Sequence, residues 1–294
     1  MKVKIGTRSS KLALSQTESI KEILEKEGYE VEIIKISTKG DRVIDRTIDK
    51  VSGNGVFTRE IEIKLLEKEI DLAVHSLKDL PSKLPQGLCL AKPPKAYGVE
   101  DVYVGKDKVH KIKDLYNKKI ATSSIRRKYL LNEYIKNVEI CTIRGNIDTR
   151  LKKVREDAID GSIFARAGID RLYTDVNYFI LDPKVFIPAP CQGILGIEIR
   201  DEDEYLTEIF DRNYDKFTNY RMEIERSFQK ELSATCTSPI GIYTQINEGK
   251  LNLYGCYKDD EQNYIKFDQI SGDISEGIFL SKKLANKLRS KYEK

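Results

Sequence analysis

Short apolar segments that run directly into polar or basic loops recur along this chain, and they constrain its fold more than any other feature. In the clearest case residues 72–74 predict a buried strand, and Ser76, Lys78 and Asp79 follow it immediately before Pro81. In an open α/β sheet ligands bind at the carboxyl ends of the strands. We therefore expect a hydroxyl, an ammonium and a carboxylate at the edge of a cleft, although a solvated turn is the commoner meaning of such a segment alone.

The same pattern predicts further strand, loop and helix units on both sides of this segment. Strands are predicted at residues 3–5, 31–36, 101–104, 119–121, 138–140 and 161–165. A helix is expected from Ser9 or Ser10 to Gly28, because a hydroxyl caps its start and a glycine suits its end. Another is expected from Thr58 to about Glu69. The fold class is therefore α/β, built from two such domains whose basic loops share one edge.

The last third of the chain has a different pattern. Residues 214–232 predict a long helix, residues 240–244, 251–256 and 264–270 three strands, and residues 277–292 a closing helix. This predicts a small α+β domain with a three-stranded antiparallel sheet. We place domain 1 at residues 1–95 and 195–214, domain 2 at 99–190 and domain 3 at 216–294, with crossing segments near residues 85–94 and 188–193.

Charge and cysteine usage exclude several classes of protein. Lys and Arg number 51 against 47 Asp and Glu, and a net charge of +4 is too small by itself to indicate nucleic-acid binding. The cysteines are scattered singly, which predicts neither a disulfide framework nor a zinc site. No signal-peptide core and no apolar run of bilayer length is present, so we expect a cytoplasmic protein with no membrane partner and no metal.

Arginines cluster in the loops at the predicted sheet edge. For any single arginine a solvated surface position is the more common explanation, but six such loop positions together indicate an anion site, because arginine forks and helix N-termini both bind carboxylates. Arg155 and Arg166 are left unassigned. The six are Arg8, Arg126, Arg127, Arg144, Arg150 and Arg171.

Cys236 is the best candidate for a functional thiol. A buried, inert thiol is the default for a lone cysteine, and Cys89, Cys141 and Cys256 fit it because they lie in apolar predicted strands. Cys236 instead lies among Thr and Ser residues, in a loop of small side chains. We therefore expect it to be presented on an entry loop of the third domain.

Taken together, these segments resemble the hydroxymethylbilane synthase family, also called porphobilinogen deaminases. The matching segments cover nearly the whole chain, and their joint specificity is high although each alone is weak. They are residues 6–8, 38–41, 74–81, 122–127, 144–146, 149–150, 167–168, 171–172, 192–193, Cys236 and 239–241.

The resemblance implies two domains similar to type II periplasmic binding proteins and a third that holds the cofactor. That cofactor would be a dipyrromethane joined to Cys236 by a thioether. The implied activity is that of a transferase in tetrapyrrole (haem and porphyrin) biosynthesis, which adds four porphobilinogen molecules in turn, each losing ammonia, and then releases the linear tetrapyrrole by hydrolysis.

The resemblance also assigns roles to residues. Asp79 would be catalytic, as a buried carboxylate that stabilises the azafulvenium and pyrrole cations of each step. Asn54 and Phe57 would belong to a loop over the site, although Phe57 is equally well a core anchor. The implied cofactor-binding set is Ser76, Lys78, Asp79, Thr122, Ser123, Ser124, Arg126, Arg127, Arg144, Gly145, Arg150 and Gln192; the implied substrate-binding set is Arg8, Ser10, Gln16, Arg144, Arg150 and Arg171.

Some positions depart from the usual family pattern. Ala234 and Thr235 stand where glycines often precede the cofactor cysteine, and Asn54 stands where a lysine is common. Cys191 replaces a glycine before Gln192 and puts a second thiol near the expected cleft. None of these removes a proposed catalytic group.

Two other functions are compatible with the basic loops. A non-enzymatic anion-binding protein would use the same arginines, but it needs no Cys236 and would normally carry an export signal. Single-stranded nucleic-acid binding would need aromatic residues for stacking, and the predicted loops offer only Phe57. We expect no nucleic-acid partner, a monomer with porphobilinogen as substrate, and a possible transient handover of product to a uroporphyrinogen-III synthase.

Overall fold

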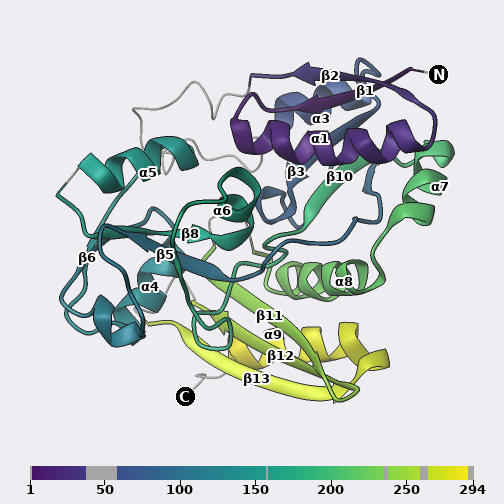
Figure 1. Ribbon diagram of the computed structural model, residues 1–294. Helices are drawn as coiled ribbons and strands as arrows, with labels where there is room; N and C mark the ends of the chain where they lie inside the picture. The colour runs from purple at the N-terminus through teal and green to yellow at the C-terminus, as the bar shows by residue number, and fades with distance from the viewer. Residues whose placement is uncertain (1, 38–57, 157, 235–237, 259–263, 291–294) are drawn as a thin grey trace. The chain divides into compact units, whose positions relative to one another are not determined.

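The computed structural model describes residues 2–37, 58–156, 158–234, 238–258 and 264–290 (Figure 1). The chain divides into two compact units, each made from two stretches of sequence. Unit 1 comprises residues 1–96 and 193–220, and unit 2 comprises residues 97–192 and 221–294.

Unit 1 contains a five-stranded sheet in the order β2-β1-β3-β10-β4. Strands β1, β2 and β3 are parallel, whereas β10 runs antiparallel to both β3 and β4. The antiparallel strand β10 belongs to the second stretch of unit 1, which follows the strands of the second α/β sheet in the sequence. Its elements are β1 (Lys2–Thr7), α1 (Lys11–Lys26), β2 (Glu30–Lys35), α3 (Arg59–Leu66), β3 (Leu72–Ser76), β4 (Leu88–Leu90), β10 (Leu195–Arg200) and α7 (Glu204–Asn213).

Helix α1 begins and ends where its sequence signals predict. The Ser10 hydroxyl accepts a hydrogen bond from the Ala13 N–H at 3.2 Å, and Gly28, just beyond the last turn, has a φ of +88°. The apolar face of α1 buries Ile20 and Leu24 against the sheet. The predicted Ser10 cap is therefore confirmed.

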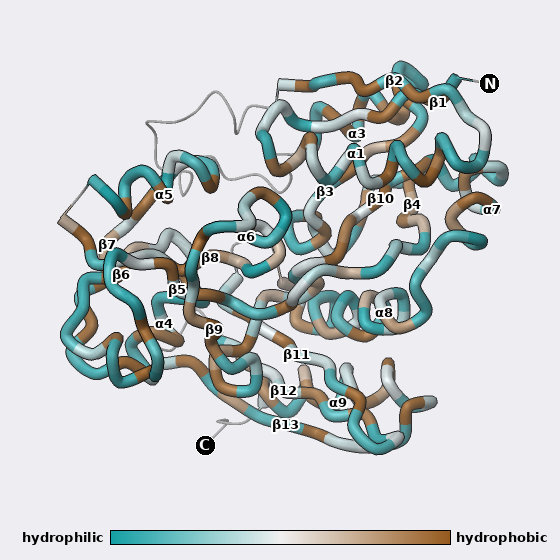
Figure 2. The backbone as a smooth tube through the Cα atoms, viewed as in Figure 1, coloured by the Kyte–Doolittle hydropathy of each residue, from teal (hydrophilic) through white to brown (hydrophobic). Residues whose placement is uncertain are grey.

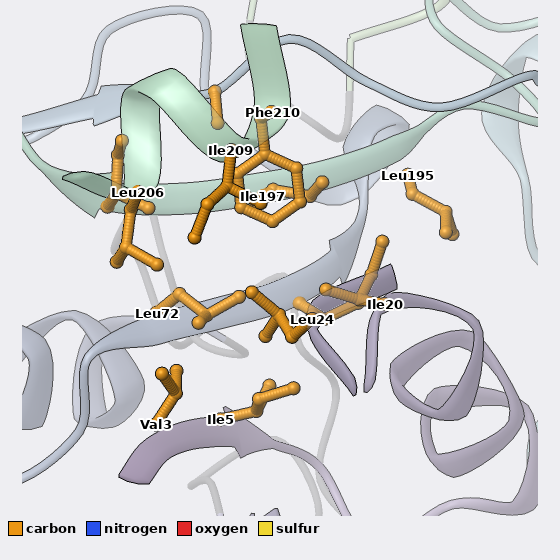
Figure 3. Close-up of a cluster of buried hydrophobic side chains, with 13 residues drawn as sticks. Val3, Ile5, Ile20, Leu24, Leu72, Leu195, Ile197, Leu206, Ile209 and Phe210 are labelled. Carbon is orange, nitrogen blue, oxygen red and sulfur yellow. The ribbon is translucent and has the colours of Figure 1, made fainter. Parts of the chain in front are cut away.

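The main core of unit 1 lies between α1, the sheet and α7. Figure 3 shows Ile20 and Leu24 of α1 near Leu72 of β3, and Ile209 and Phe210 of α7 near Ile197 of β10. All six residues of β10 are buried, as expected for a strand covered on both faces, and Figure 2 shows much of this strand in hydrophobic brown.

Unit 2 contains a second five-stranded sheet, in the order β7-β6-β8-β5-β9. Here β6 is parallel to β7 and β8, and β5 is antiparallel to β8 and β9, so the second sheet repeats the arrangement of the first. Its elements are β5 (Asp101–Gly105), β6 (Lys119–Ala121), α4 (Ile125–Tyr134), β7 (Glu139–Cys141), α5 (Ile147–Glu156), β8 (Gly161–Ala165), α6 (Arg166–Leu172) and β9 (Phe179–Ile180).

Unit 2 also contains a three-stranded antiparallel sheet in the order β11-β12-β13. Helix α9 packs against it closely at Gly255, where an added Cβ would lie 2.9 Å from Leu284. The sheet also contacts the segment that follows β9, because the Ile242 N–H of β11 donates to the Pro188 carbonyl at 3.0 Å. The elements are β11 (Ile240–Asn247), β12 (Lys250–Tyr257), β13 (Lys266–Asp273), α9 (Gly277–Ser290) and the part of α8 (Lys216–Glu231) from residue 221 onward.

The predicted fold class is confirmed by these sheets, two of mixed α/β type and one small and antiparallel. Helix α7 and strands β9 and β10 were not predicted, whereas Cys89 lies in the short strand β4, in line with its predicted place in an apolar strand. The proposed division into three domains stays a prediction, because the second and third fall within one compact unit. Within the described ranges, no helix combines the length and apolar character needed to span a membrane.

Candidate active site

The predicted site residues come from both units, and most of them lie in the described part of the chain. Cys236, Asn54, Phe57 and the predicted loop at residues 38–41 lie outside it.

In unit 1, the turn after β3 presents Lys78 and Asp79 between two anchoring leucines. Residues Leu77–Asp79 form a short 3-10 helix, η2, in which Leu77 is 1% exposed and the following Leu80 is fully buried. The Leu77 N–H donates to the Ile194 carbonyl at 3.0 Å. The turn can lie this close to β10 because Gly196 has no side chain, where a Cβ would come within 2.9 Å of Leu80.

Asp79 is exposed, and this corrects the expectation of a buried carboxylate. The buried leucines on either side orient its backbone, while its side chain faces solvent. Only a bound ligand could therefore shield this carboxylate from water.

Ser76, the last residue of β3, is paired with Gln16 of α1. The Gln16 side-chain Nε2 lies 2.9 Å from the Ser76 Oγ, and Gln16 is 9% exposed. The resemblance assigned Ser76 to the cofactor and Gln16 to the substrate, and it did not predict a direct contact between their side chains. Arg8 follows β1 and is half-buried, and Ser10 caps α1.

On the opposite face of β3, under α3, lies a polar cluster that sequence reasoning missed. His75 Nε2 lies 2.9 Å from Glu198 Oε2 of β10, and both side chains are almost fully buried. Burial, and then the charge of Glu198, raises the pKa of Glu62 of α3 above its usual value.

In unit 2, Arg126 and Arg127 of α4 converge on the buried carboxylate of Asp101. Arg126 Nη2 lies 2.8 Å from Asp101 Oδ2, and Arg127 Nη2 lies 2.6 Å from Oδ1. Burial by itself would raise the pKa of Asp101, but the charges of the two arginines hold it well below its usual value. The arginines also donate to the Ile187 and Ile163 carbonyls, at 2.6 and 3.0 Å.

Arg150 of α5 joins the same group. Its Nη2 donates to the Ile163 carbonyl at 2.7 Å, which Arg127 also contacts, and its guanidinium lies 4.3 Å from the centre of the Phe164 ring. Burial, and then the charge of Arg127, lowers the pKa of Arg150 to about 9. Among the described residues its buried Nε has no hydrogen-bond partner.

The charges in this cluster do not balance. Within the described ranges Asp101 is the carboxylate that pairs with Arg126 and Arg127, and Arg150 has none at ion-pair distance. Removing charge from water is costly unless an opposite charge compensates it. The arginine cluster, defined as Arg126, Arg127 and Arg150 with Asp101, therefore carries excess positive charge among the described residues.

The remaining predicted residues of unit 2 lie in the loops around this cluster. Thr122 is 1% exposed and its Oγ1 accepts from the Ser124 N–H at 3.2 Å, while the Ser124 Oγ caps α4. Ser123 is exposed and donates to the Ile143 carbonyl. Gly145 has a φ of +114°, which glycine tolerates best. Arg144 is half-buried.

Arg171 of α6 is also half-buried. It lies 4.0 Å from the centre of the Tyr97 ring, and burial lowers its pKa.

Gln192, predicted to contact the cofactor, is fully buried and supports Asp101 instead of opening onto a cavity. Its Nε2 donates to Asp101 Oδ1 at 3.0 Å and to the Val99 carbonyl at 2.8 Å. Its backbone carbonyl accepts from Arg221 of α8 at 2.5 Å. Asp101 and Arg221 are functional candidates that the sequence analysis missed. The adjacent arginines Arg126 and Arg127 could have indicated Asp101, because two neighbouring guanidiniums that are buried require a nearby carboxylate.

The other thiols differ in their surroundings. Cys191 is 1% exposed, and burial followed by the charge of Glu225 raises its pKa far above the ordinary range, so it stays a thiol. Cys256 is buried as predicted, with its pKa raised to about 12. Cys89 and Cys141 are only half-buried. In the described ranges no group of His, Cys, Asp and Glu is arranged to hold a metal ion.

Among solved structures, this chain is similar to solute-binding proteins. An ancestral cationic amino-acid solute binding protein matches with a TM-score of 0.44 at 15% identity, covering 72% of this chain and 87% of that one. A probable amino-acid ABC transporter binding protein from Bacillus subtilis matches with a TM-score of 0.45 at 12% identity, covering 72% and 90%.

Sequence comparisons identify the family. Residues 3–208 match the model of the porphobilinogen deaminase dipyromethane cofactor binding domain, and residues 219–290 match that of the porphobilinogen deaminase C-terminal domain. The porphobilinogen deaminase of Clostridium beijerinckii is 41% identical over 98% of both chains. That of Clostridioides difficile is 37% identical over 100% of this chain and 99% of its own. The chain belongs to the porphobilinogen deaminase family.

Proposed function

We propose that this protein is a hydroxymethylbilane synthase, which condenses four porphobilinogen molecules with loss of ammonia and releases the linear tetrapyrrole by hydrolysis. The observation that carries the proposal is the excess positive charge of the arginine cluster, where Asp101 is the single carboxylate paired with its guanidiniums in the described ranges. A pyrrole chain with acetate and propionate groups is the kind of polyanion that such a cluster accepts.

The cluster fits a dipyrromethane cofactor attached to Cys236. Arg150 has a buried Nε that lacks a partner among the described residues, and burial disfavours its charge. A carboxylate at this point would satisfy the Nε and restore the ordinary pKa of the guanidinium. When bound, the cofactor supplies the pyrrole carbon to which the first substrate unit is joined.

The arginines of this chain would bind and orient the carboxylates. Arg126, Arg127 and Arg150 would hold the cofactor, with Thr122, Ser123, Ser124, Gly145 and Gln192 shaping the surrounding loops. Arg144 would serve cofactor and substrate, and Arg8, Ser10, Gln16 and Arg171 the substrate. Arginine suits this role because it binds carboxylates in two-pronged fashion and stays charged at physiological pH.

Asp79 would stabilise positive charge on the substrate. Loss of ammonia from porphobilinogen leaves a cation, and a carboxylate fixed nearby lowers the energy of the transition state that leads to it. Asp79 is exposed in the described structure, so this role requires that substrate and cofactor cover it. Ser76 and Lys78 would position the rings beside it.

The proposal extends to the setting of the enzyme. We infer that it acts as a cytoplasmic monomer on porphobilinogen. We also infer that its unstable linear product is handed to a uroporphyrinogen-III synthase.

The decisive experiment is the intact mass of the purified protein. We expect an excess equal to two linked pyrrole units, abolished by Cys236→Ser and retained by Cys191→Ser, whose thiol is buried. A pure anion-binding protein would show the mass of the bare chain. Folded, active protein without the excess, or an excess that survives Cys236→Ser, would refute the assignment.

A further inference from the structure

A continuous set of buried polar contacts joins the arginine cluster to helix α8. It begins at Asp101, whose Oδ1 accepts from Arg127 and from Gln192 at 2.6 and 3.0 Å. It continues from the Gln192 carbonyl to Arg221 Nη2 at 2.5 Å. All of these side chains are buried, Asp101 and Gln192 completely.

The same contacts continue into the small antiparallel sheet. Arg221 Nε lies 3.2 Å from Glu225 Oε1 one helical turn later. Glu225 also accepts from the Thr244 hydroxyl of β11 at 3.0 Å and from the Cys191 N–H at 2.5 Å. Helix α8 ends at Glu231, and the chain then leads to Cys236.

We propose that Asp101 is a positioning residue that aligns Arg126 and Arg127 for the cofactor, and that Gln192 and Arg221 tie this alignment to the helix preceding Cys236. This inference rests on the proposed function. It adds a second layer of residues, which fixes the geometry of the groups that touch the cofactor.

The geometry of Asp101 supports positioning over simple neutralisation. Asp101 Oδ2 accepts a hydrogen bond from Arg126, and Asp101 Oδ1 accepts one from Arg127. One carboxylate therefore sets the angle between two guanidiniums. A buried ion pair contributes little net stability compared with apolar packing, so stability alone is a weak reason for it. A fixed pair of arginine forks is what recognition of carboxylates requires.

The test compares Asp101→Asn with two controls in the full-length chain. Glu100→Gln removes the neighbouring carboxylate, which is ion-paired with Arg166 at 3.2 Å outside these contacts. Val102→Ala removes a fully buried apolar contact from the same strand and reports the effect of lost stability alone. For each variant the cofactor-bearing fraction is measured by intact mass, kcat and KM on that fraction, and the unfolding midpoint by circular dichroism.

We expect Asp101→Asn to lower the cofactor-bearing fraction several-fold. In the fraction that is loaded, kcat/KM should fall by about 10- to 100-fold, the range typical for partners that orient a ligand-binding side chain. Both controls should stay fully loaded. Asp101→Asn protein that is as fully loaded as the controls, with unchanged kcat and KM, would overturn the proposal.

Gln192→Leu keeps the test decisive if Asp101→Asn does not fold, because it removes only the amide donor. We expect a partly loaded protein with an unfolding midpoint near that of wild type. Where both variants fold, the double variant should be no worse than Asp101→Asn alone, because Gln192 acts through Asp101. Strictly additive losses, or fully loaded Gln192→Leu protein with unchanged kcat and KM, count against the proposal. A wild-type protein without the mass excess would instead refute the proposed function.

Discussion

At the scale of single residues, the contrast between Asp79 and Asp101 shows how environment assigns different tasks to the same side chain. Asp79 is exposed at the end of η2, whereas Asp101 is fully buried and held between two arginines. The buried carboxylate is already satisfied by its partners, which suits the positioning role proposed for it. Under the proposed function, the exposed carboxylate would keep its oxygens available for the positive charge that develops during reaction.

The first prediction concerns Asp79→Asn. We expect this variant to fold and to carry the cofactor mass, because the side chain is exposed and its neighbours Leu77 and Leu80 anchor the turn. Turnover should fall on the order of a hundredfold or more, as when other electrostatic groups are removed from active sites. Steady-state rates measure this. Asp201→Asn, at another exposed carboxylate of unit 1, is the matched control, and near-normal turnover of Asp79→Asn would exclude the catalytic role.

Cys191 gives a second prediction at this scale. Its φ is +60°, a left-handed conformation that costs a residue with a side chain about 1–2 kcal/mol. Cys191→Gly should therefore keep the cofactor and lie within about 1 kcal/mol of wild type in unfolding free energy. Cys191→Val should lose about 1–3 kcal/mol in urea denaturation. Equal stability of the two variants would contradict this account.

Single residues also show where sequence reasoning ends. Most of the arginines were identifiable because they lie between a strand and the first turns of the next helix, which is a local pattern. Asp101 opens a strand too, but its partners lie 25 and 26 positions away. No local periodicity marks such a contact. Similarly, the exposure of Asp79 depends on how Leu77 and Leu80 pack, which the run of residues 76–81 does not specify.

At the scale of elements, sequence predicted those helices and strands for which several local signals agree. Helices α1 and α8 have caps or many periodic apolar positions. The three-residue strands β6 and β7 were predicted because each runs into a polar loop, whereas β9, with two residues, is too short to show a period. Helix α7 was detectable, since Leu206, Ile209 and Phe210 have helical spacing and are buried.

The packing of strand β11 provides a prediction at this scale. At Gly241 an added Cβ would lie 2.7 Å from the Pro188 carbonyl and 2.9 Å from that of Ile187, which accepts from Arg126. Gly241→Ala should therefore cost about 1–3 kcal/mol in unfolding free energy and lower the cofactor-bearing fraction. Gln245→Ala, a half-buried position in the same strand, is the control. If the two variants are equally stable and equally loaded, this contact does not support the arginine cluster.

At the scale of the whole molecule, each unit contains a buried carboxyl whose pKa is raised. Burial is the main cause for Glu62 in unit 1 and for Glu225 in unit 2. Between the ordinary value of 4.5 and the raised value, the folded state binds more protons than the unfolded state. Stability therefore increases as pH falls through the raised pKa.

Asp101 has the opposite effect at lower pH. Its pKa is depressed in the folded state, so its contribution is present above the ordinary value of 3.8 and is lost as pH falls toward the depressed value. The combined expectation is that unit 2 gains stability on mild acidification and loses it on further acidification. Unit 1 is also expected to gain stability on mild acidification, because the pKa of Glu62 is raised.

The last prediction separates these contributions with one variant in each unit. Glu225→Gln should flatten the rise in stability of unit 2 as pH falls toward the ordinary carboxyl value of 4.5 and leave unit 1 unchanged, while Glu62→Gln should do the reverse, because each removes one carboxyl whose pKa is raised in the folded state. Hydrogen exchange at increasing urea concentrations measures this, with amides of β3 and α3 reporting unit 1 and those of β5 and α4 reporting unit 2. A rise that persists in the substituted unit would mean that another group carries the pH dependence.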